Sequence, residues 1–173
     1  DLGRKAHKAP EYLAINPAGQ IPTIVDHAAP GGPRVLAQSA AIVLYACEKA
    51  GRHIPADRGA YWTALQWAMQ AATDIGGASA GLQQVAVVAP EKVPSTVDLF
   101  EQRFMRYFGY VEQLQGRDFL AGDFSFADIM AYPNYVLRRA LIDRLGDLPH
   151  LRAWAARMAL RPGVQAGMQL LEA

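Results

Sequence analysis

The sequence predicts an α/β unit followed by an all-helical domain, within a chain of 173 residues. Two short apolar stretches, Thr23-Ile24-Val25 and Val35-Leu36, are separated by a Gly/Pro-rich turn at 30–33, and this pattern is typical of two paired strands. From Gly59 onward, apolar residues recur at the three- and four-residue spacing of amphipathic helices. The charged, proline-containing segment 52–58 is typical of a linker.

We therefore expect two domains, at residues 1–52 and 59–173. With 51% hydrophobic and 19% charged residues, the chain has the composition of a globular protein with a sizeable core. The net charge of +1 does not favour nucleic acid or an anionic membrane surface as a partner. We interpret the arginines near the C-terminus as a solvated helix face, not as a nucleic-acid patch: Arg138, Arg139, Arg144, Arg152, Arg157 and Arg161.

Cysteine content and hydropathy bear on the compartment. No apolar run approaches the roughly 20 residues that span a bilayer, and we see no signal peptide. The single cysteine, Cys47, excludes an intramolecular disulfide and fits a reducing compartment. Its position favours a small core side chain over a reactive thiol. We expect a cytoplasmic protein with no membrane partner.

The N-terminal unit contains an exposed backbone segment before its first strand. A short helix is predicted over 10–15 and ends at the Asn16-Pro17 step. If the Ile21-Pro22 bond is cis, which an X-Pro bond can be at modest cost, the chain turns sharply there. The Ile21 N–H and C=O would then face outward, unpaired by the sheet, and could pair with the backbone of an extended peptide.

A second helix is predicted from Gln38 to about Ala50, with Gly51 as its C-cap. Its residues 42–47 are apolar nearly all round, so we expect burial on two sides. The N–H groups at its start attract an anion, and Gln38 and Ser39 add side-chain hydrogen bonds for a carboxylate or an amine. One segment therefore offers both a backbone for pairing and a carboxylate pocket.

These residues carry a family resemblance. NPAGQIPTIVD followed by QSAAIVLYACEKAG resembles the second half of the thioredoxin-like domain of a glutathione transferase. The resemblance implies that the residue before the cis-proline pairs with the cysteinyl backbone of glutathione and that a Gln-Ser pair holds the γ-glutamyl end. It assigns Ile21, Pro22, Gln38 and Ser39 to glutathione binding. It also implies a β-α-β unit of roughly 30 residues upstream of Asp1, without which the first strand would have an open edge.

The helical domain is predicted element by element. A first helix has a stripe of Trp62, Leu65, Gln66, Met69 and Thr73, with Gly76-Gly77 weakening or bending it near its middle. After a break at 89–94 comes a long amphipathic helix that ends at Gly116. Its stripe consists of Val97, Phe100, Phe104, Phe108 (or Tyr107), Val111 and Leu114.

Ser125 and Asp128 form a predicted capping box at the start of the next helix. The stretch FLAGDFSFADI also resembles the capping box of the helical domain of glutathione transferases, where it is a folding element. We expect Pro133 to bend or end this helix. Two further helices, at about 148–160 and 164–171, close the chain, and the implied fold is a thioredoxin-like domain, its second half only, followed by a glutathione transferase C-terminal helical bundle.

The residues show no catalytic group of their own. The four histidines and one cysteine have no metal-ligand spacing, so we expect no metal site, and there is no nucleophile elbow, phosphate loop or dinucleotide fingerprint. In the family the group that activates the glutathione thiol lies at the start of the first β-α-β unit. The catalytic residue is therefore unknown.

The order of motifs is similar to that of the bacterial nu-class-like group, which acts as glutathione-dependent disulfide reductases and transferases. Two positions depart from that group: His7 stands where it tends to carry a glutamine, and Leu99 where it carries an arginine that holds a glutathione carboxylate. His7 can still bond a carboxylate, so we count it as a fifth candidate glutathione-binding residue. Leu99 cannot, and Arg103 and Arg106 are possible substitutes for the arginine. These departures put in doubt disulfide reduction with two bound glutathiones.

We predict a homodimeric glutathione transferase-like enzyme that uses the thiolate of its co-substrate glutathione on a small hydrophobic electrophile or a disulfide. The alternative is a non-catalytic binding or scaffold protein of the same fold. Several aromatic residues either belong to the core or line a pocket for the hydrophobic substrate: Tyr61, Trp62, Trp67, Phe104, Phe108, Tyr132 and Tyr135.

Overall fold

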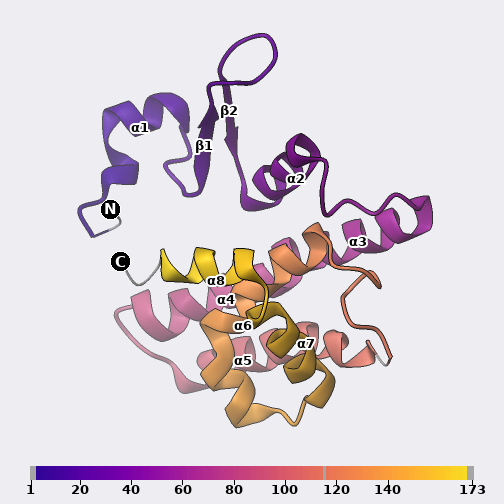
Figure 1. Cartoon of the computed structure of the whole chain (residues 1–173). Coiled ribbons are helices and arrows are strands. Elements are labelled where there is room, and N and C mark those ends of the chain that lie inside the picture. Colours follow the sequence, from indigo (N-terminus) through magenta and orange to yellow (C-terminus); the bar gives the residue numbers. More distant parts are fainter. Residues whose placement is uncertain (1–2, 115, 171–173) are drawn as a thin grey trace. The chain divides into compact units, whose positions relative to one another are not determined.

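The computed structural model describes residues 3–114 and 116–170. The chain divides into two compact units, residues 1–52 and 53–173. The first unit contains the 3-10 turn η1 (Ala6–Lys8), helix α1 (Pro10–Ile15), strands β1 (Thr23–Asp26) and β2 (Arg34–Ala37), and helix α2 (Ser39–Ala50). In Figure 1 the two strands stand between α1 and α2.

The two strands form the predicted antiparallel pair, and each is slightly longer than the sequence indicates. Thr23 lies opposite Ala37 and Asp26 lies opposite Arg34. The turn between them needs Gly31 and Gly32, whose φ angles of 84° and 109° lie in a region that favours glycine. The Ile21-Pro22 bond before β1 is cis, as considered from the sequence.

Helix α2 begins at Ser39, one residue later than predicted, and Gly51 caps it as expected with a φ of 61° and an N–H bonded to the Cys47 and Glu48 carbonyls. The prediction that the helix is buried on two sides is wrong for this chain. Cys47 is its buried residue, and residues 42–45 are half-buried. Its contacts are with the two strands of the hairpin, β1 and β2.

A hydrogen-bonded carboxylate links β1 to α2. The Asp26 carboxylate forms an ion pair with Lys49, accepts a 2.5 Å hydrogen bond from the Tyr45 hydroxyl and accepts the Ala28 N–H at 2.9 Å. These bonds, that of Lys49 first, lower the pKa of Asp26 from 3.8 to about 2. The hairpin is therefore held to the helix by an ionised group.

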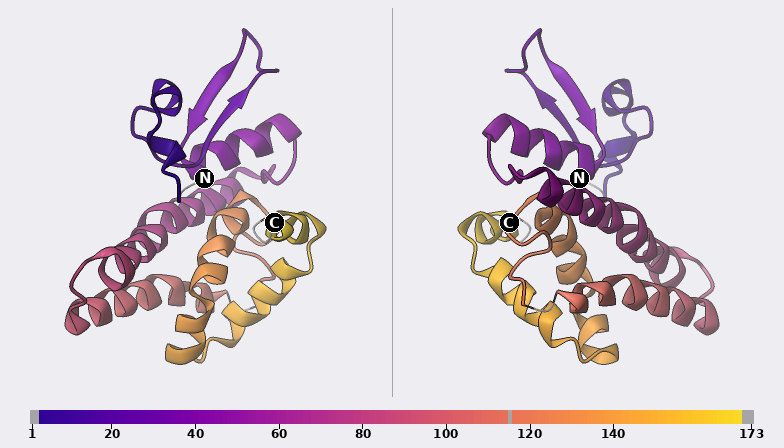
Figure 2. Two further views of the ribbon diagram at one scale, coloured as in Figure 1. Left: turned by 90° about the vertical axis from the view of Figure 1, so that its left-hand side faces the viewer. Right: turned by 90° about the vertical axis from the view of Figure 1, so that its right-hand side faces the viewer.

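The second unit begins with one long helical rod that spans residues 58–88 (Figure 2). Helix α3 (Arg58–Gln70) continues through the π-helical turn η2 (Ala71–Ile75) into α4 (Gly76–Gln83) and a second π-helical turn, η3 (Gln84–Val88). The sequence predicts a weakened or bent helix at the two glycines, and the π-helical turn η2 lies just before them. A Cβ at Gly76 would lie 2.9 Å from the Ala71 carbonyl oxygen, so the π-helical turn itself requires glycine there.

The face of this rod that packs into the core is not the predicted one. Trp62 and Met69 are exposed, and the residues buried on α3 and η2 are instead Ala64, Ala68, Ala71 and Ile75. The alanines let α3 and η2 lie close to α6 (Phe126–Leu145). The face of α3 that is buried is therefore the one with small side chains, which allow close approach of α6, and not the one with large apolar side chains.

The remaining elements are α5 (Pro94–Gly109), the 3-10 turn η4 (Tyr110–Gln113), α6, α7 (Pro149–Ala159) and α8 (Pro162–Gln169). Helix α5 ends at Gly109, earlier than the predicted Gly116, because the chain tightens into η4. The predicted end of the last helix at Leu171 lies outside the described residues. The large fully buried apolar side chains of this core are Ile75, Phe104, Phe108, Val111, Leu114, Leu120, Phe126, Ile142, Leu151, Trp154 and Met158.

The capping box at the start of α6 is confirmed. The Ser125 side chain accepts the Ala127 N–H at 3.3 Å, and the Asp128 carboxylate accepts the Ser125 N–H at 3.0 Å. Asp128 is fully buried and also accepts the Leu120 N–H at 3.0 Å and the Trp154 Nε1–H at 2.8 Å. Burial raises the pKa of this carboxyl, and the hydrogen bonds oppose that rise.

Helix α6 departs from regular geometry at Arg138, not at Pro133. Arg138 has φ −115° and ψ 17°, and the helix continues past it to Leu145. Its guanidinium donates to the Ser79 carbonyl at 2.6 Å and to the Ser79 hydroxyl at 3.0 Å. Arg138 therefore anchors α6 to α4, so the interpretation of this arginine as part of a solvated face is wrong.

No helix within residues 3–114 and 116–170 combines the length and apolar character that crossing a membrane requires.

Candidate functional site

The segment before β1 is held by side chains of α1 and by the residue that ends this helix. The Tyr12 hydroxyl and the Asn16 Nδ2 donate to the Gln20 carbonyl oxygen at 2.6 and 2.7 Å. Both also lie 2.9 Å from the Thr23 Oγ1. The chain therefore enters the cis Ile21-Pro22 bond from a fixed position.

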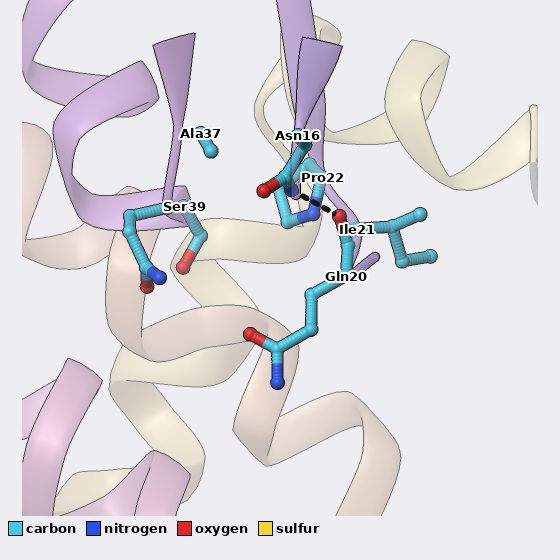
Figure 3. A pocket seen from close by; sticks show the side chains of 7 residues that line it. Asn16, Gln20, Ile21, Pro22, Ala37 and Ser39 are labelled. Atoms are coloured by element: carbon cyan, nitrogen blue, oxygen red, sulfur yellow. Dashed lines mark hydrogen bonds between the residues drawn. The ribbon is translucent and has the colours of Figure 1, made fainter. Parts of the chain in front are cut away.

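A small hollow opens beside this segment. It is lined by two stretches of chain that are adjacent in space, with Asn16, Gln20, Ile21 and Pro22 on one side and Ala37, Gln38 and Ser39 on the other. Figure 3 shows the Ile21 side chain pointing away from Ser39. The hollow contains about 280 Å³, open solvent included. This is less than the roughly 300–1,000 Å³ of sites that surround a drug-sized ligand, so the hollow accommodates one part of a ligand.

The α2 side of the hollow is suited to an anion. Gln38 precedes the helix with a φ of 73°, which is unusual for a residue other than glycine. Ser39 is the first helical residue, and the N–H groups of a first helical turn lack intrahelical acceptors. The positive end of the α2 dipole and the Ser39 hydroxyl can together bind a carboxylate.

The Ile21 backbone supplies the other half of the site. Among residues 3–114 and 116–170, none hydrogen-bonds the Ile21 N–H or its carbonyl. These two groups can therefore pair with the main chain of an extended peptide, as a strand edge does. A peptide with a free carboxylate at one end matches both halves.

The structure brings together four of the five residues predicted for the site. Ile21, Pro22, Gln38 and Ser39 line the hollow, and His7 does not. His7 belongs to η1, and its carbonyl oxygen lies 3.1 Å from the place of a Cβ at Gly19. The His7 Nδ1 is buried, with no hydrogen-bond partner among the residues that the structure describes.

Sequence reasoning missed Asn16, Gln20 and Ala37, which complete the lining. In the sequence, Asn16 indicates only the end of the short helix over 10–15. The signal that could have singled it out is an asparagine at a helix end five residues before an X-Pro step, since its amide both donates and accepts. Ala37 ends β2 and reaches the hollow because the strand pairing places it opposite Thr23.

The burial of the aromatic residues in the helical unit shows which of them belong to the core. Phe104 and Phe108 are fully buried and stacked with their ring centroids 5.4 Å apart, so they belong to the core. Trp62 is 53% exposed and lies under the Arg58 guanidinium, 4.7 Å from it. Leu99 is 60% exposed on α5 and offers no hydrogen bond.

Helix α5 also carries Arg103 and Arg106, the two possible substitutes for the arginine that Leu99 replaces. Arg103 and Arg106 are exposed on α5, and the Arg103 guanidinium lies over the Tyr107 ring at 5.7 Å.

The chain's own sulfur is not part of the site. Cys47 is 5% exposed, and burial raises the pKa of its thiol. Within the described parts of the chain, no group of three or more His, Cys, Asp or Glu side chains is placed to hold a metal ion. Sulfur chemistry would therefore have to come from a bound thiol.

A cis-proline segment beside a helix N-terminus, followed by a helical unit, is the arrangement that the resemblance to glutathione transferases predicts. Residues 2–49 match the family described as glutathione S-transferase, N-terminal domain, and residues 65–162 match the family described as glutathione S-transferase, C-terminal domain.

Two curated relatives cover nearly the whole chain. The disulfide-bond oxidoreductase YfcG of Escherichia coli strain K12 is 32% identical over 178 residues, which span 100% of this chain and 81% of that protein. The glutathione S-transferase-like protein tpcF of Aspergillus fumigatus is 32% identical over 180 residues, spanning 93% of this chain and 79% of that protein.

Solved structures agree with this assignment. A glutathione transferase from Burkholderia graminis, with two glutathione molecules bound per subunit, has a TM-score of 0.87 and 30% identity, over 96% of this chain and 74% of its own. A glutathione transferase from Pseudomonas putida, with one glutathione disulfide bound per subunit, has a TM-score of 0.89 and 26% identity, over 96% and 76%. The chain belongs to the glutathione S-transferase family.

Proposed function

We propose that this protein is an enzyme that binds glutathione as a co-substrate and uses its thiolate on an electrophile or a disulfide. The observation that carries the proposal is the hollow in which the unpaired Ile21 backbone and the start of α2 lie side by side. The cysteinyl backbone of glutathione pairs with Ile21, and its γ-glutamyl end binds at Gln38 and Ser39. Relatives described as transferases and as disulfide-bond oxidoreductases support both kinds of second substrate.

The chemistry follows from the thiolate as nucleophile. With a disulfide, the glutathione sulfur forms a bond to one sulfur, the disulfide bond breaks, and the other sulfur leaves as a thiolate. A second glutathione then displaces the remaining thiol, so that two glutathiones are oxidised to glutathione disulfide and one disulfide is reduced to two thiols. With an aryl halide, the sulfur bonds to carbon and halide leaves.

The larger organisation of the protein is also part of the proposal. Residues 1–52 form the thioredoxin-like part that binds glutathione, and residues 59–173 form the all-helical domain. The exposed Trp62 and Met69 on α3 support a homodimer, because large apolar side chains grouped on one helix are typical of a covered surface. The free Cys47 supports a cytoplasmic location, since thiols persist in reducing compartments.

Binding to glutathione is the first test, measured by calorimetry on the intact protein. Ser39→Ala removes one hydrogen bond to a carboxylate and should raise the Kd about tenfold. Ser95→Ala, at an exposed serine of α5, is the matched control and should leave the Kd unchanged. A Kd that does not respond to Ser39→Ala contradicts the proposed site.

Turnover is the second test and separates an enzyme from a scaffold. Aryl-halide conjugation and glutathione-dependent disulfide exchange are measured on the same protein. We expect turnover in at least one assay, lowered in proportion to binding by Ser39→Ala at low glutathione. Binding without turnover in either assay would establish the non-catalytic alternative.

A further inference from the structure

One backbone carbonyl beside the site is fixed by several side chains. The Gln20 oxygen accepts the Tyr12 hydroxyl at 2.6 Å and the Asn16 Nδ2 at 2.7 Å. The Thr23 Oγ1 lies 3.4 Å from the same oxygen and bonds both donors at 2.9 Å. The dashed line in Figure 3 marks the bond from Asn16. Together these side chains fix the direction in which the Gln20 C=O bond points.

That direction determines where the next N–H points. The Gln20 carbonyl and the Ile21 N–H belong to one peptide group, and this peptide is trans, since the cis bond of the described residues is Ile21-Pro22. In a trans peptide the C=O and N–H point in opposite directions. With the Gln20 oxygen held toward Asn16 and Tyr12, the Ile21 N–H points away from both, where no described residue bonds it.

Asn16 is itself held on every polar group. Its N–H donates to the Tyr12 carbonyl and its carbonyl accepts the Gly19 N–H, both at 2.9 Å. Its Oδ1 accepts the Ala18 N–H at 3.3 Å, which leaves Nδ2 facing Gln20. The side chain is 7% exposed, so water cannot readily replace it as a donor. Asn16 therefore connects the end of α1 to the site through a single rigid amide.

We propose that Asn16 is a positioning residue of the glutathione site, which aims the Ile21 N–H at the cysteinyl carbonyl of glutathione by fixing the Gln20 carbonyl. Asn16 acts through Gln20 and need not touch the ligand. The inference rests on the proposed function, because it concerns the backbone pair that Ile21 makes with glutathione.

Asn16→Asp tests this with little change of size. The aspartate keeps the Oδ1 acceptor for Ala18, and it places a carboxylate oxygen instead of an N–H donor against the Gln20 oxygen. We expect the Kd for glutathione to rise about tenfold, with the calorimetric stoichiometry unchanged. In turnover assays the KM for glutathione should rise by the same factor, with kcat within about twofold.

A merely structural role gives a different result, because misfolded protein lowers the stoichiometry and kcat while the remaining folded protein keeps its Kd and KM. That pattern would overturn the inference. Asn134→Asp on α6, in the other unit, is the matched control and should change neither quantity. If Asn16→Asp does not fold, Tyr12→Phe removes the other donor and should raise the Kd about threefold. Its control is Tyr110→Phe, at an exposed tyrosine.

Failure of the inference is distinct from failure of the proposed function. A protein that does not bind glutathione, or binds it with no response to Ser39→Ala, overturns the proposed function. Binding that Ser39→Ala weakens, but that Asn16→Asp and Tyr12→Phe leave unchanged, overturns the role of Asn16 alone.

Discussion

Trp154 on α7 donates its Nε1–H to the Asp128 carboxylate in the first turn of α6, across 2.8 Å, and both side chains are fully buried. The same carboxylate accepts the N–H groups of Leu120 and Ser125, each at 3.0 Å. One buried group therefore joins the loop before α6, the start of α6 and the middle of α7. The capping box is thus also a junction between elements distant in sequence.

This junction predicts a large loss of stability on small substitutions. Trp154→Phe removes one hydrogen bond to a charged group and should lower the free energy of unfolding by about 2 kcal/mol. Asp128→Asn turns an amide N–H toward backbone donors, which leaves buried hydrogen bonds unmade and should cost about 3 kcal/mol. Denaturant unfolding measures both. The control Tyr110→Phe, at a 42% exposed tyrosine, should stay within about 0.5 kcal/mol. A Trp154→Phe protein as stable as this control would contradict the role of the bond.

A second prediction concerns acid stability and Asp26. Its folded-state pKa is about 2, below the ordinary 3.8, because Lys49 and Tyr45 bond the ionised form. A lowered carboxyl pKa stabilises the fold above the ordinary pKa, and this contribution disappears as the pH falls through the folded-state value. The wild type should therefore be more stable than Asp26→Asn at pH 5, with the difference shrinking between about pH 4 and pH 2.

Unfolding curves at several pH values measure this difference. Asp98→Asn, at an exposed position of α5, is the control and should show a constant difference from the wild type. A gap between wild type and Asp26→Asn that stays the same from pH 5 to pH 2 would show that the Asp26 contacts do not perturb its titration.

Several strand and helix boundaries could be predicted from the sequence because a single residue type marks each of them. Pro22 before an apolar run indicated the strand and its turn, Gly51 indicated the end of α2, and Ser125 with Asp128 indicated the start of α6. Each is a short-range signal, in which one residue type has a special backbone or capping role. The residues Ile21, Pro22, Gln38 and Ser39 of the candidate site came from the same kind of signal together with the family resemblance.

Features that depend on packing between distant parts of the chain could not be predicted from the sequence. Trp62 and Met69 fit the helical period but are exposed, and Ala64 and Ala68 are buried instead, because α6 approaches α3 closely. This approach cannot be predicted from the spacing of apolar residues. In the sequence, Arg138 cannot be distinguished from the other arginines near the C-terminus. Its bonds to Ser79, 59 residues away, hold it against α4. Asn16 was likewise missed, because its hydrogen bond to the Gln20 carbonyl, four residues ahead, is visible only in the structure.

Cys47 allows a prediction about the chain's own sulfur. Its thiol is 5% exposed, and burial raises its pKa, so little reactive thiolate forms near neutral pH. A thiol reagent such as dithiobis(nitrobenzoate) should react slowly with the native protein and with one thiol per chain after denaturation. Disulfide exchange should survive Cys47→Ala, because glutathione supplies the sulfur. Rapid reaction of the native protein, or loss of exchange by a folded Cys47→Ala variant, would assign Cys47 a chemical role.

Two glycines of α4 give a matched pair for the packing of α4 against α5. A Cβ on Gly81 would lie 2.1 Å from the nearest atom of the Phe100 ring, whereas a Cβ on Gly77 meets nothing within 4 Å. Replacing a helical glycine with alanine normally stabilises by about 0.5–1 kcal/mol, so Gly77→Ala should raise the free energy of unfolding by that amount.

At Gly81 the same substitution forces the Phe100 ring to move, and overpacking of this kind costs about 1–3 kcal/mol. Gly81→Ala should therefore be destabilising by about 1–2 kcal/mol after the helical gain is subtracted. The double variant Gly81→Ala with Phe100→Leu should recover part of the loss, because the smaller side chain leaves room for the new methyl group. If Gly81→Ala stabilises the protein as much as Gly77→Ala does, α4 and α5 are not in the close contact that the structure shows.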